Sequence, residues 1–556
     1  MSNERKTANR AWRALIGLAA APVVAWCQTP VVSSVVDSAS YAATLGSPGA
    51  IVSIFGTNLA AATATTQGLP LPRQLGGTRV TWNGVAAPLF YVSPTQINFQ
   101  VPSPNDETPG VVVVAGVVVS TAAGNSAPYS PGANAWEVAG VFSMDASGCG
   151  QGAVLNVADD GSVSVNSPAN SVSPGGWMSI YGTGLTFLTS QYPPDGAPTP
   201  LTPLIESDPI GQVVFDFQDL LQAPSAAWAG LAPGSVGLDQ TNVRIPASVR
   251  EGCAVPLQIA YDDNSRAMSQ PVTLAIRQGG GPCVDPPAAG YGQITWQETV
   301  SETVSDVSSQ PYFTSETDTV TVSLQSSPGM QAPAAPVYSE GSLPSSLTLF
   351  GPSCPVPGYR SLGAGTVTMQ GPGFSPTQVP VAPFQQGQLG GLTAYQAALP
   401  NGAMAQAGTY TVTASGGADV GAFQAAIQIG ADIQIQNGLV GMDVWAGCTP
   451  LTVNWTGGDP NSWVTVSLVQ SEPAWAGGFQ GVNFAGQTRA SNGTLTMPPL
   501  IMPGDQCGTG PGAPIVISVE VDPDPSEITS FSASGLSLGG QVTWKYIHTF
   551  QAFLVQ

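Results

Sequence analysis

A fourteen-residue segment that occurs twice constrains the fold of this chain more than any other feature. The first copy, SPGAIVSIFGTNLA, spans residues 47–60, and the second, SPGGWMSIYGTGLT, spans residues 173–186. A further shared pattern, Q-x-N-x-[QR]-[VI]-P, follows each copy, at residues 96–102 and 240–246. Matched segments at this spacing predict a duplicated module of domain size.

The residues of the first module predict antiparallel strands. Asn83-Gly84 separates the runs 78–82 and 85–92, and both turn residues tolerate the positive φ angles that a two-residue hairpin requires. Further short runs rich in Val, Thr, Ser and Ile, separated by Gly, Pro and Asn, continue to the C-terminus. The chain therefore reads as a succession of short strands joined by turns.

The composition supports the same conclusion for the whole chain. Of 556 residues, 66 are Gly and 51 are Pro, which interrupt helices, and only 8% are charged, so that Lys, Glu and Arg, which favour helices, are scarce. We predict an all-β fold of tandem immunoglobulin-like β-sandwich modules.

Three segments carry a resemblance to a known family. They are residues 47–60, residues 75–102 (LGGTRVTWNGVAAPLFYVSPTQINFQVP) and residues 137–143 (EVAGVFS). They resemble the secreted-protein C-terminal domain that is expanded in acidobacteria, an uncharacterised family similar to IPT/TIG immunoglobulin-like domains. The resemblance covers residues 31–277, more closely in the first copy. It implies a fold and a secreted protein, and it supplies no activity and no catalytic residues.

We expect six segments along the chain. They are a signal peptide (1–28), a first IPT/TIG-like β-sandwich (29–135), a second (136–277), a Gly/Pro linker (278–290), a third β-rich module (291–429) and a fourth β-sandwich module (430–556).

The N-terminus predicts secretion. Four basic residues precede the apolar run 14–25, which is too short to span a bilayer of about 30 Å. Cys27 would suit a lipoprotein anchor, but Trp26 stands where such a site needs a small residue, so cleavage after residue 27 or 28 is expected. The protein is predicted to be secreted or held at the cell surface, with no transmembrane segment.

The net charge of -21 disfavours nucleic acid and anionic membranes as partners. An extracellular protein or a polysaccharide remains as the partner, and the sequence leaves the oligomeric state open.

Six cysteines remain after the leader, and an even number in a secreted chain predicts disulfides. Fifteen pairings exist for six cysteines. The simplest hypothesis is that each bridge closes within neighbouring sequence: Cys149 with Cys253, Cys283 with Cys354, and Cys448 with Cys507. With His548 as the only histidine and no CxxC pair, no zinc site is expected.

Two motifs resemble catalytic or binding loops. The glycines of residues 47–60 could hold an anion, but neither a helix start nor a Lys follows them. The structural interpretation is that Pro48-Gly49 turns the chain into a strand whose Ser53 points away from the core, and that Gly56 lets the strand bend out. Gly535-Leu-Ser537-Leu-Gly539 fits a nucleophile elbow, but a strand pattern follows it, and no acid lies between Ser537 and His548.

Acidic and aromatic residues supply the other candidates. The pairs Asp159-Asp160, Asp262-Asp263 and Asp522-Pro-Asp524 could offer oxygen ligands to Ca²⁺, but solvated turns explain them better. Trp228 and Trp475 lie in predicted loops and are candidates for contact with sugar rings. Four tryptophans lie in strand patterns and are expected in the core: Trp82, Trp177, Trp455 and Trp463.

These observations favour a non-enzymatic secreted protein with a structural, adhesive or binding role, and no catalytic, cofactor or metal residues are assigned. The alternative is a polysaccharide-binding protein that uses exposed aromatic side chains. A hydrolase that uses a carboxylate pair is the third hypothesis, and it would require two carboxylates facing each other across a cleft.

Overall fold

The computed structural model describes residues 28–555 except for a set of short segments, which are 45, 104–115, 131–138, 187–191, 208–210, 217–223, 262–266, 307–308, 334–335, 337, 339, 344–352, 387–388, 400–405, 441–442, 446–449, 471–483 and 498–512. In the described part there are strands, turns and two 3₁₀ helices, η4 (Ala490–Asn492) and η5 (Pro525–Glu527), and no α-helix. The all-β prediction is confirmed. The expected signal peptide lies almost wholly outside the described residues, and no described helix could cross a membrane.

The first module is a sandwich of two antiparallel sheets. One sheet has the order β1 (Val31–Asp37), β2 (Ile51–Thr57), β7 (Gln96–Gln100), β6 (Leu89–Val92), β3 (Ala64–Thr65), and the other has the order β5 (Val85–Ala86), β4 (Arg79–Trp82), β8 (Val117–Thr121), β9 (Gly124–Asn125). The predicted Asn83-Gly84 turn joins β4 to β5, with both residues at positive φ. Side chains from both sheets, among them Ile54, Phe99 and Val119, fill one core.

The second module repeats this architecture. One sheet has the order β12 (Val163–Val165), β11 (Val154–Val157), β13 (Trp177–Thr183), β16 (Asp239–Arg244), β15 (Trp228–Leu231), with β10 (Gly140–Val141) also beside β13. The facing sheet contains β14 (Gln212–Phe215), β17 (Gly252–Tyr261), β18 (Ala267–Met268) and β19 (Val272–Ile276). Met178 and Ile180 of β13 pack into the shared core.

The C-terminal half is built on one large sheet of twelve strands. Its main path is β22 (Gly341–Leu343), β34 (Phe484–Arg489), β33 (Trp463–Gln470), β36 (Ala513–Asp522), β38 (Gly540–Val555), β20 (Ala288–Asp306), β21 (Ser309–Pro328), β27 (Leu389–Ala398), β26 (Val381–Gln386). Three short strands attach to it: β23 (Arg360–Ser361) beside β21, and β31 (Asp443–Trp445) and β37 (Thr529–Phe531) beside β38.

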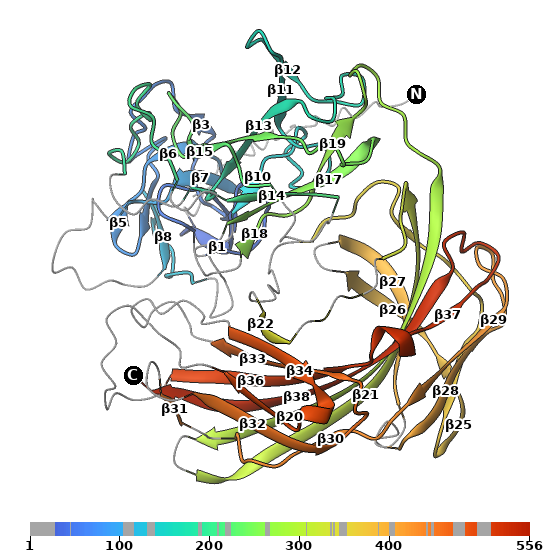
Figure 1. The fold of residues 1–556 in the computed structure, drawn as a ribbon. Helices are drawn as coiled ribbons and strands as arrows, with labels where there is room; N and C mark the ends of the chain where they lie inside the picture. The colour runs from blue at the N-terminus through green and yellow to red at the C-terminus, as the bar shows by residue number, and fades with distance from the viewer. Residues whose placement is uncertain are drawn as a thin grey trace, which may run out of the picture.

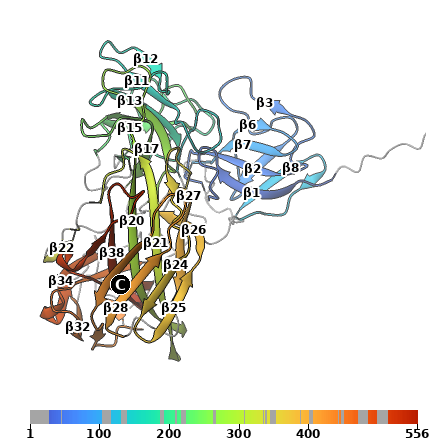
Figure 2. The same cartoon turned by 90° about the vertical axis from the view of Figure 1, so that its right-hand side faces the viewer.

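Two smaller sheets cover the large one and share its core. One has the order β25 (Phe374–Val379), β24 (Val367–Gly371), β28 (Gly408–Ala414), β29 (Phe423–Ile429), and the other has the order β30 (Ile433–Ile435), β32 (Leu451–Gly457), β35 (Thr494–Met497). In Figures 1 and 2 the long strands β20 and β21 run from the second sandwich into the C-terminal half, and the first sandwich lies to the side of the second.

The pairing of β20 with β38 is parallel and joins the start of the C-terminal half to its end. Gly292–Glu302 of β20 lies beside Gly540–Phe550 of β38. The strands on either side of residue 430 therefore belong to one sheet and one core. The predicted domain boundaries stay predictions, and the expected third and fourth modules are treated below as one C-terminal half.

The two sandwiches make direct polar contacts with each other. The backbone N–H of Ile51 donates to Thr183 Oγ1 at 2.7 Å, and Thr183 Oγ1 donates in turn to the carbonyl of Gly237 at 2.8 Å. The side chain of Gln270 donates to the carbonyl of Ala39 at 3.3 Å. These bonds fix the first copy of the duplicated module against the second.

The predicted disulfide pairings are wrong for four cysteines. Cys149 is bonded to Cys354 and Cys253 to Cys283, with Cα atoms 5.7 and 5.2 Å apart. The second pair forms because the chain that leaves β19 passes beside the start of β17. The first pair forms because a segment of the C-terminal half returns to the second sandwich, which the assumption of bridges within neighbouring sequence could not foresee. Cys448 and Cys507 lie outside the described residues.

A buried carboxyl group lies where the sandwiches meet. Asp37 is 1% exposed, and its Oδ1 accepts hydrogen bonds from Ala39 N, Ser40 N and Ser40 Oγ, while its Oδ2 is buried without a hydrogen-bond partner. Burial raises the pKa of Asp37 to about 7, with a smaller contribution from the nearby carboxyl of Asp239 and against the effect of the hydrogen bonds from Ser40 and Ala39. The folded protein therefore holds a proton on Asp37 that the unfolded chain releases at much lower pH.

We predict that Asp37→Asn removes a pH-dependent loss of stability. The stabilising contribution of the protonated Asp37 is complete below about pH 4 and is lost as the pH rises through about 7, a change of about 2–4 kcal/mol. Asparagine copies the protonated form, so the free energy of unfolding of the wild type should fall relative to that of the variant between pH 4 and pH 8. Urea unfolding at several pH values measures this difference.

The substitution Glu251→Gln, at an exposed site of the second sandwich, controls for the loss of one negative charge. Parallel pH profiles for the wild type and Asp37→Asn would contradict the prediction.

Candidate functional site

The repeated segment is a turn followed by a core strand in both copies. Ala50 N bonds to Ser47 O, and Gly176 N bonds to Ser173 O, which closes turns with Gly49 and Gly175 at positive φ. This is the geometry of a type II turn with Pro and Gly at its centre. Strands β2 and β13 follow, so the segment lacks the helix start that an anion site would need.

The glycine near the end of the strand in each copy, Gly56 or Gly182, allows a neighbouring strand to approach closely. A Cβ atom on Gly56 would lie 2.0 Å from the carbonyl oxygen of Val31, and one on Gly182 would lie 2.4 Å from that of Gly140. Strand β1 is irregular opposite Gly56, between Val32 and Ser34. These glycines are therefore required by backbone packing rather than by a bend of their own strand.

A row of hydrogen-bonded polar side chains lies on the outer face of both sandwiches. In the first copy Ser53 Oγ and Gln96 Nε2 both bond to Asn98 Oδ1, and in the second Ser179 Oγ and Gln240 Nε2 bond to Asn242 Oδ1 at 2.8 and 2.9 Å. Ser53 does point away from the core, as predicted, but it is buried, with 1% exposed. The duplicated motif thus preserves a polar row together with a strand.

Aromatic residues surround this row in the second sandwich. The register of β13 with β16 places Trp177 beside Arg244 and Tyr181 beside Gln240, while β15 places Trp228 beside Asn242. Because Met178 and Ile180 point into the core, strand alternation puts Trp177 and Tyr181 on the outer face.

Trp177 is 39% exposed, so the expectation that it lies in the core was wrong. The alternation of Trp177, Ser179 and Tyr181 with Met178 and Ile180 was visible in the sequence and could have identified it. Trp82 is half-buried, whereas Trp455 and Trp463 are buried as expected.

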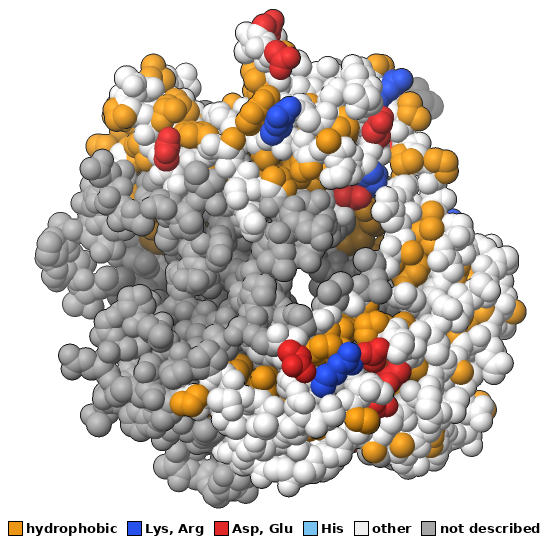
Figure 3. All heavy atoms as spheres, viewed as in Figure 1, with side chains coloured by type: hydrophobic (Ala, Val, Ile, Leu, Met, Phe, Trp, Pro, Cys, Tyr) orange, Lys and Arg blue, Asp and Glu red, His pale blue; other side chains and the backbone are white. Residues whose placement is uncertain are grey.

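The apolar part of this face extends over the β11–β12 hairpin. Val163 and Val165 are 58% and 45% exposed, and they pair with Val157 and Leu155, which in turn pair with Trp177 and Ser179. In Figure 3 hydrophobic side chains lie along this hairpin, which projects at the top of the view. We call the outer surface of β12, β11, β13, β16 and β15 the aromatic face.

Of the two tryptophans predicted to contact sugar, one belongs to this face. Trp228 lies in strand β15 rather than in a loop, is half-buried, and donates its Nε1 hydrogen to Glu206 Oε1 at 3.1 Å. Trp475 lies outside the described residues.

The matching face of the first sandwich is partly covered by the second. Gln100 corresponds to Arg244 in the repeat, but Gln100 is 9% exposed and accepts a bond from Gly196 N at 2.7 Å, whereas Arg244 is exposed. Ile51, which corresponds to Trp177, packs beside Gly237. The surface that the two copies share is therefore exposed to solvent only in the second copy.

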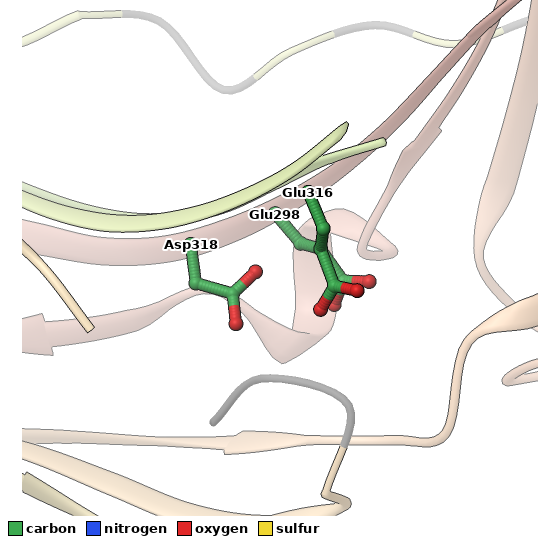
Figure 4. A group of neighbouring side chains, drawn as sticks. All are labelled: Glu298, Glu316 and Asp318. Carbon is green, nitrogen blue, oxygen red and sulfur yellow. The ribbon is translucent and has the colours of Figure 1, made fainter. Parts of the chain in front are cut away.

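A second group of polar side chains lies in the C-terminal half. Glu298 of β20 pairs with Asp318 of β21, and Glu316 lies two residues before Asp318 on β21, opposite Val300. One carboxylate oxygen from each of the three lies within 4.8 Å of the others. Figure 4 shows the three side chains on the same side of the hairpin, with the carboxyl groups of Glu298 and Glu316 close together.

The surroundings of this group raise the pKa of Glu298 and of the nearby Asp432. Burial, assisted by Asp432, Asp318 and Glu316, raises the pKa of Glu298 to about 8. Burial likewise raises the pKa of Asp432 to about 6, and the two carboxyl groups share a hydrogen bond. Glu316 and Asp318 lie at alternate positions of one strand, which is a pattern visible in the sequence, but neither residue was among the predicted site residues.

In the described residues, the serine of the nucleophile-elbow match does not contact His548. Ser537 Oγ accepts a bond from Gly290 N at 3.1 Å and borders an open hollow of about 420 Å³, which is also lined by Arg360 and Asp419. Strand β38 follows it, and His548 lies roughly 26 Å further along that strand than Gly540. His548 contacts Glu302 at 2.8 Å and Tyr546 at 3.0 Å instead.

The acidic pairs considered for Ca²⁺ have other roles where they are described. Asp160 accepts a bond from Ser162 N in an exposed turn, Asp522 lies 3.6 Å from Lys545, and Asp524 forms an ion pair with Arg489. Asp262-Asp263 lies outside the described residues.

Comparisons with known proteins identify no family. No family description and no curated protein matches the sequence. Among solved structures, the full extracellular region of plexin A4 aligns with 88% of this chain at 10% identity and a TM-score of 0.15. Dimeric latent PorU from Porphyromonas gingivalis aligns with 72% of this chain at 11% identity and a TM-score of 0.15. The eight N-terminal Ig domains of Down syndrome cell adhesion molecule align with 92% of this chain at 11% identity and a TM-score of 0.12.

This chain spans 31%, 34% and 53% of those three chains, respectively. Structural similarities with such low TM-scores carry no information about the function of this chain.

We predict that Gly56→Ala destabilises the first sandwich by about 1–3 kcal/mol or more, because its Cβ would collide with the backbone of Val31. Gly68→Ala is the matched control, since a Cβ there meets nothing within 4 Å and its φ is not positive. Urea unfolding of both variants measures the difference. Equal stability of the two variants would show that the close approach of β1 does not require glycine.

Proposed function

We propose that this protein is a non-enzymatic, extracytoplasmic binding protein whose aromatic face holds a polysaccharide, which gives it an adhesive role. The observation that carries the proposal is the arrangement of Trp177, Trp228 and Tyr181 around the polar row at Asn242. Aromatic rings offer flat apolar surfaces to the C–H faces of sugars, and neutral amide groups between them can bond to hydroxyl groups.

The spacing of the aromatic residues suits an extended ligand. Trp228 is two strands away from Trp177 and two residues further along, which places their Cα atoms about 12 Å apart. Tyr181 has the same offset from Trp228 in the opposite direction along the strands, so it too lies about 12 Å away. Three aromatic positions at such distances favour a chain of several sugar units over a single small molecule.

The polar groups on the face favour a neutral polysaccharide. Ser179, Asn242 and Gln240 contribute hydroxyl and amide groups already linked by hydrogen bonds, which holds them in place before a ligand arrives. Arg244 adds one cation, while the protein as a whole carries a net charge of -21, which opposes a strongly anionic polymer.

The proposal of no enzymatic activity rests on the positions of the candidate catalytic groups. A glycosidase needs two carboxyl groups on either side of a substrate cleft. The acidic group of the C-terminal half instead lies against the core, with Glu298 and Asp318 buried at 4% exposure each. In the described residues Ser537 has no basic partner from His548, whose ring bonds to Glu302.

The test is binding to a panel of insoluble and soluble neutral polysaccharides, followed by substitution of the aromatic residues. Trp177→Ala and Trp228→Ala should each weaken binding about tenfold or more, a loss of roughly 1.4 kcal/mol or above. Affinity electrophoresis or isothermal titration with the best polysaccharide measures the change.

Phe313→Ala is the matched control, because Phe313 is 58% exposed but lies in β21, away from the aromatic face. Binding that survives both tryptophan substitutions, or the absence of binding to every polysaccharide in the panel, would refute the proposal.

A further inference from the structure

The acidic group of the C-terminal half gathers four carboxyl groups from three segments of chain. Glu298 comes from β20, Glu316 and Asp318 come from β21, and Asp432 comes from the short connection between β29 and β30. The register of the long β20–β21 hairpin brings the first three together, and the packing of β30 against the large sheet adds the fourth. The group therefore links the hairpin to one of the sheets that cover it.

The oxygen atoms have the separations of a cation's ligands. One oxygen each from Glu298, Glu316 and Asp318 lies within 4.8 Å of the others. Oxygens bound to Ca²⁺ lie 2.3–2.6 Å from the ion, so two ligands of one ion are at most about 5 Å apart. The group is thus already compact enough for one ion.

An unsatisfied oxygen points to a missing positive partner. Glu298 is 4% exposed, and no N–H or O–H group of the described residues donates a hydrogen bond to its buried Oε2, although the carboxyl group of Asp432 lies close by. Figure 4 shows this carboxyl group directed toward that of Glu316. A buried carboxylate oxygen without a partner is costly, and either a proton or a cation must compensate it.

We propose that Glu298, Glu316, Asp318 and Asp432 form a Ca²⁺ site that fastens the β20–β21 hairpin to the β29–β30 connection. All four donors are carboxylates, without histidine or cysteine, which selects a hard cation. Ca²⁺ accepts the irregular, mixed mono- and bidentate ligands that such side chains offer, whereas Mg²⁺ demands near-ideal octahedral geometry. Glu316 is exposed, so the ion has a route from solvent.

The experiment uses Tb³⁺ as a luminescent substitute for Ca²⁺ on the full chain. Trp296 precedes Glu298 by two residues on the same face of β20, about 7 Å away between Cα atoms, so exciting tryptophan should sensitise bound Tb³⁺. We expect luminescence that Ca²⁺ displaces, together with a thermal midpoint that Ca²⁺ raises and EDTA lowers.

Variants assign the signal to this site. Glu298→Gln and Glu316→Gln should each weaken Ca²⁺ competition at least tenfold, whereas Glu251→Gln, an exposed carboxyl of the second sandwich, should leave it unchanged. Because Glu316 is exposed, its substitution remains informative even where Glu298→Gln folds poorly.

Luminescence that Ca²⁺ does not displace, or equal Ca²⁺ competition in Glu316→Gln and the wild type, would overturn the site. The result is independent of the proposed function, since Trp177→Ala removes a side chain of a different sandwich and should leave Tb³⁺ binding intact.

Discussion

The parallel pairing of β20 with β38 is the contact on which the C-terminal half depends. It places Gly292 beside Gly540, and the ring of Phe531 packs so closely over both glycines that a Cβ on either would lie within 2.7 Å of it. The same ring stacks on that of Phe423, with the two ring centroids 4.8 Å apart. This contact joins β37 and β29 to the pair of strands β20 and β38. In the C-terminal half, the first strand, β20, therefore pairs directly with the last strand, β38. The register of the β20–β21 hairpin places Glu298 and Asp318 opposite each other, and the Cys149–Cys354 bond connects the same half to the second sandwich.

Duplication of the sandwich has produced one shared surface with two different uses. Both copies retain the polar row that starts at Ser53 or Ser179, together with the glycine that lets a neighbouring strand approach. In the first copy the surface is an interface, because Gly196 and Gly237 of the second copy rest on Gln100 and Ile51. In the second copy the equivalent positions carry Arg244 and Trp177, which are exposed. The surface that forms an interface in the first sandwich is therefore exposed, as the aromatic face, in the second. The proposed binding role depends on this difference.

Local features could be predicted from the sequence, and contacts between distant segments could not. The Pro48-Gly49 turn, the Asn83-Gly84 hairpin and the outward direction of Ser53 follow from short-range backbone preferences and strand alternation, and all three are present. The disulfide partners were assigned wrongly because the return of the segment around Cys354 to the second sandwich leaves no trace in local sequence. The exposure of Trp177 could have been predicted from strand alternation alone, because Met178 and Ile180 face the core. The prediction instead followed the general rule that tryptophans in strands are buried. The acidic group depends on the register of a long hairpin and on Asp432, which lies in the connection between two other sheets, and neither can be read from local sequence.

The central claim is that the aromatic face of the second sandwich contacts a polysaccharide while the remaining sheets act as scaffold. Hydroxyl-radical footprinting, read by mass spectrometry with and without a bound polysaccharide, tests it directly because it reports the solvent access of individual side chains. The account predicts that oxidation of Trp177, Tyr181 and Trp228 falls on binding, while that of the exposed Phe313 in β21 does not change. Protection that appears in the first sandwich or the C-terminal half, with Trp177 oxidised as before, would contradict it.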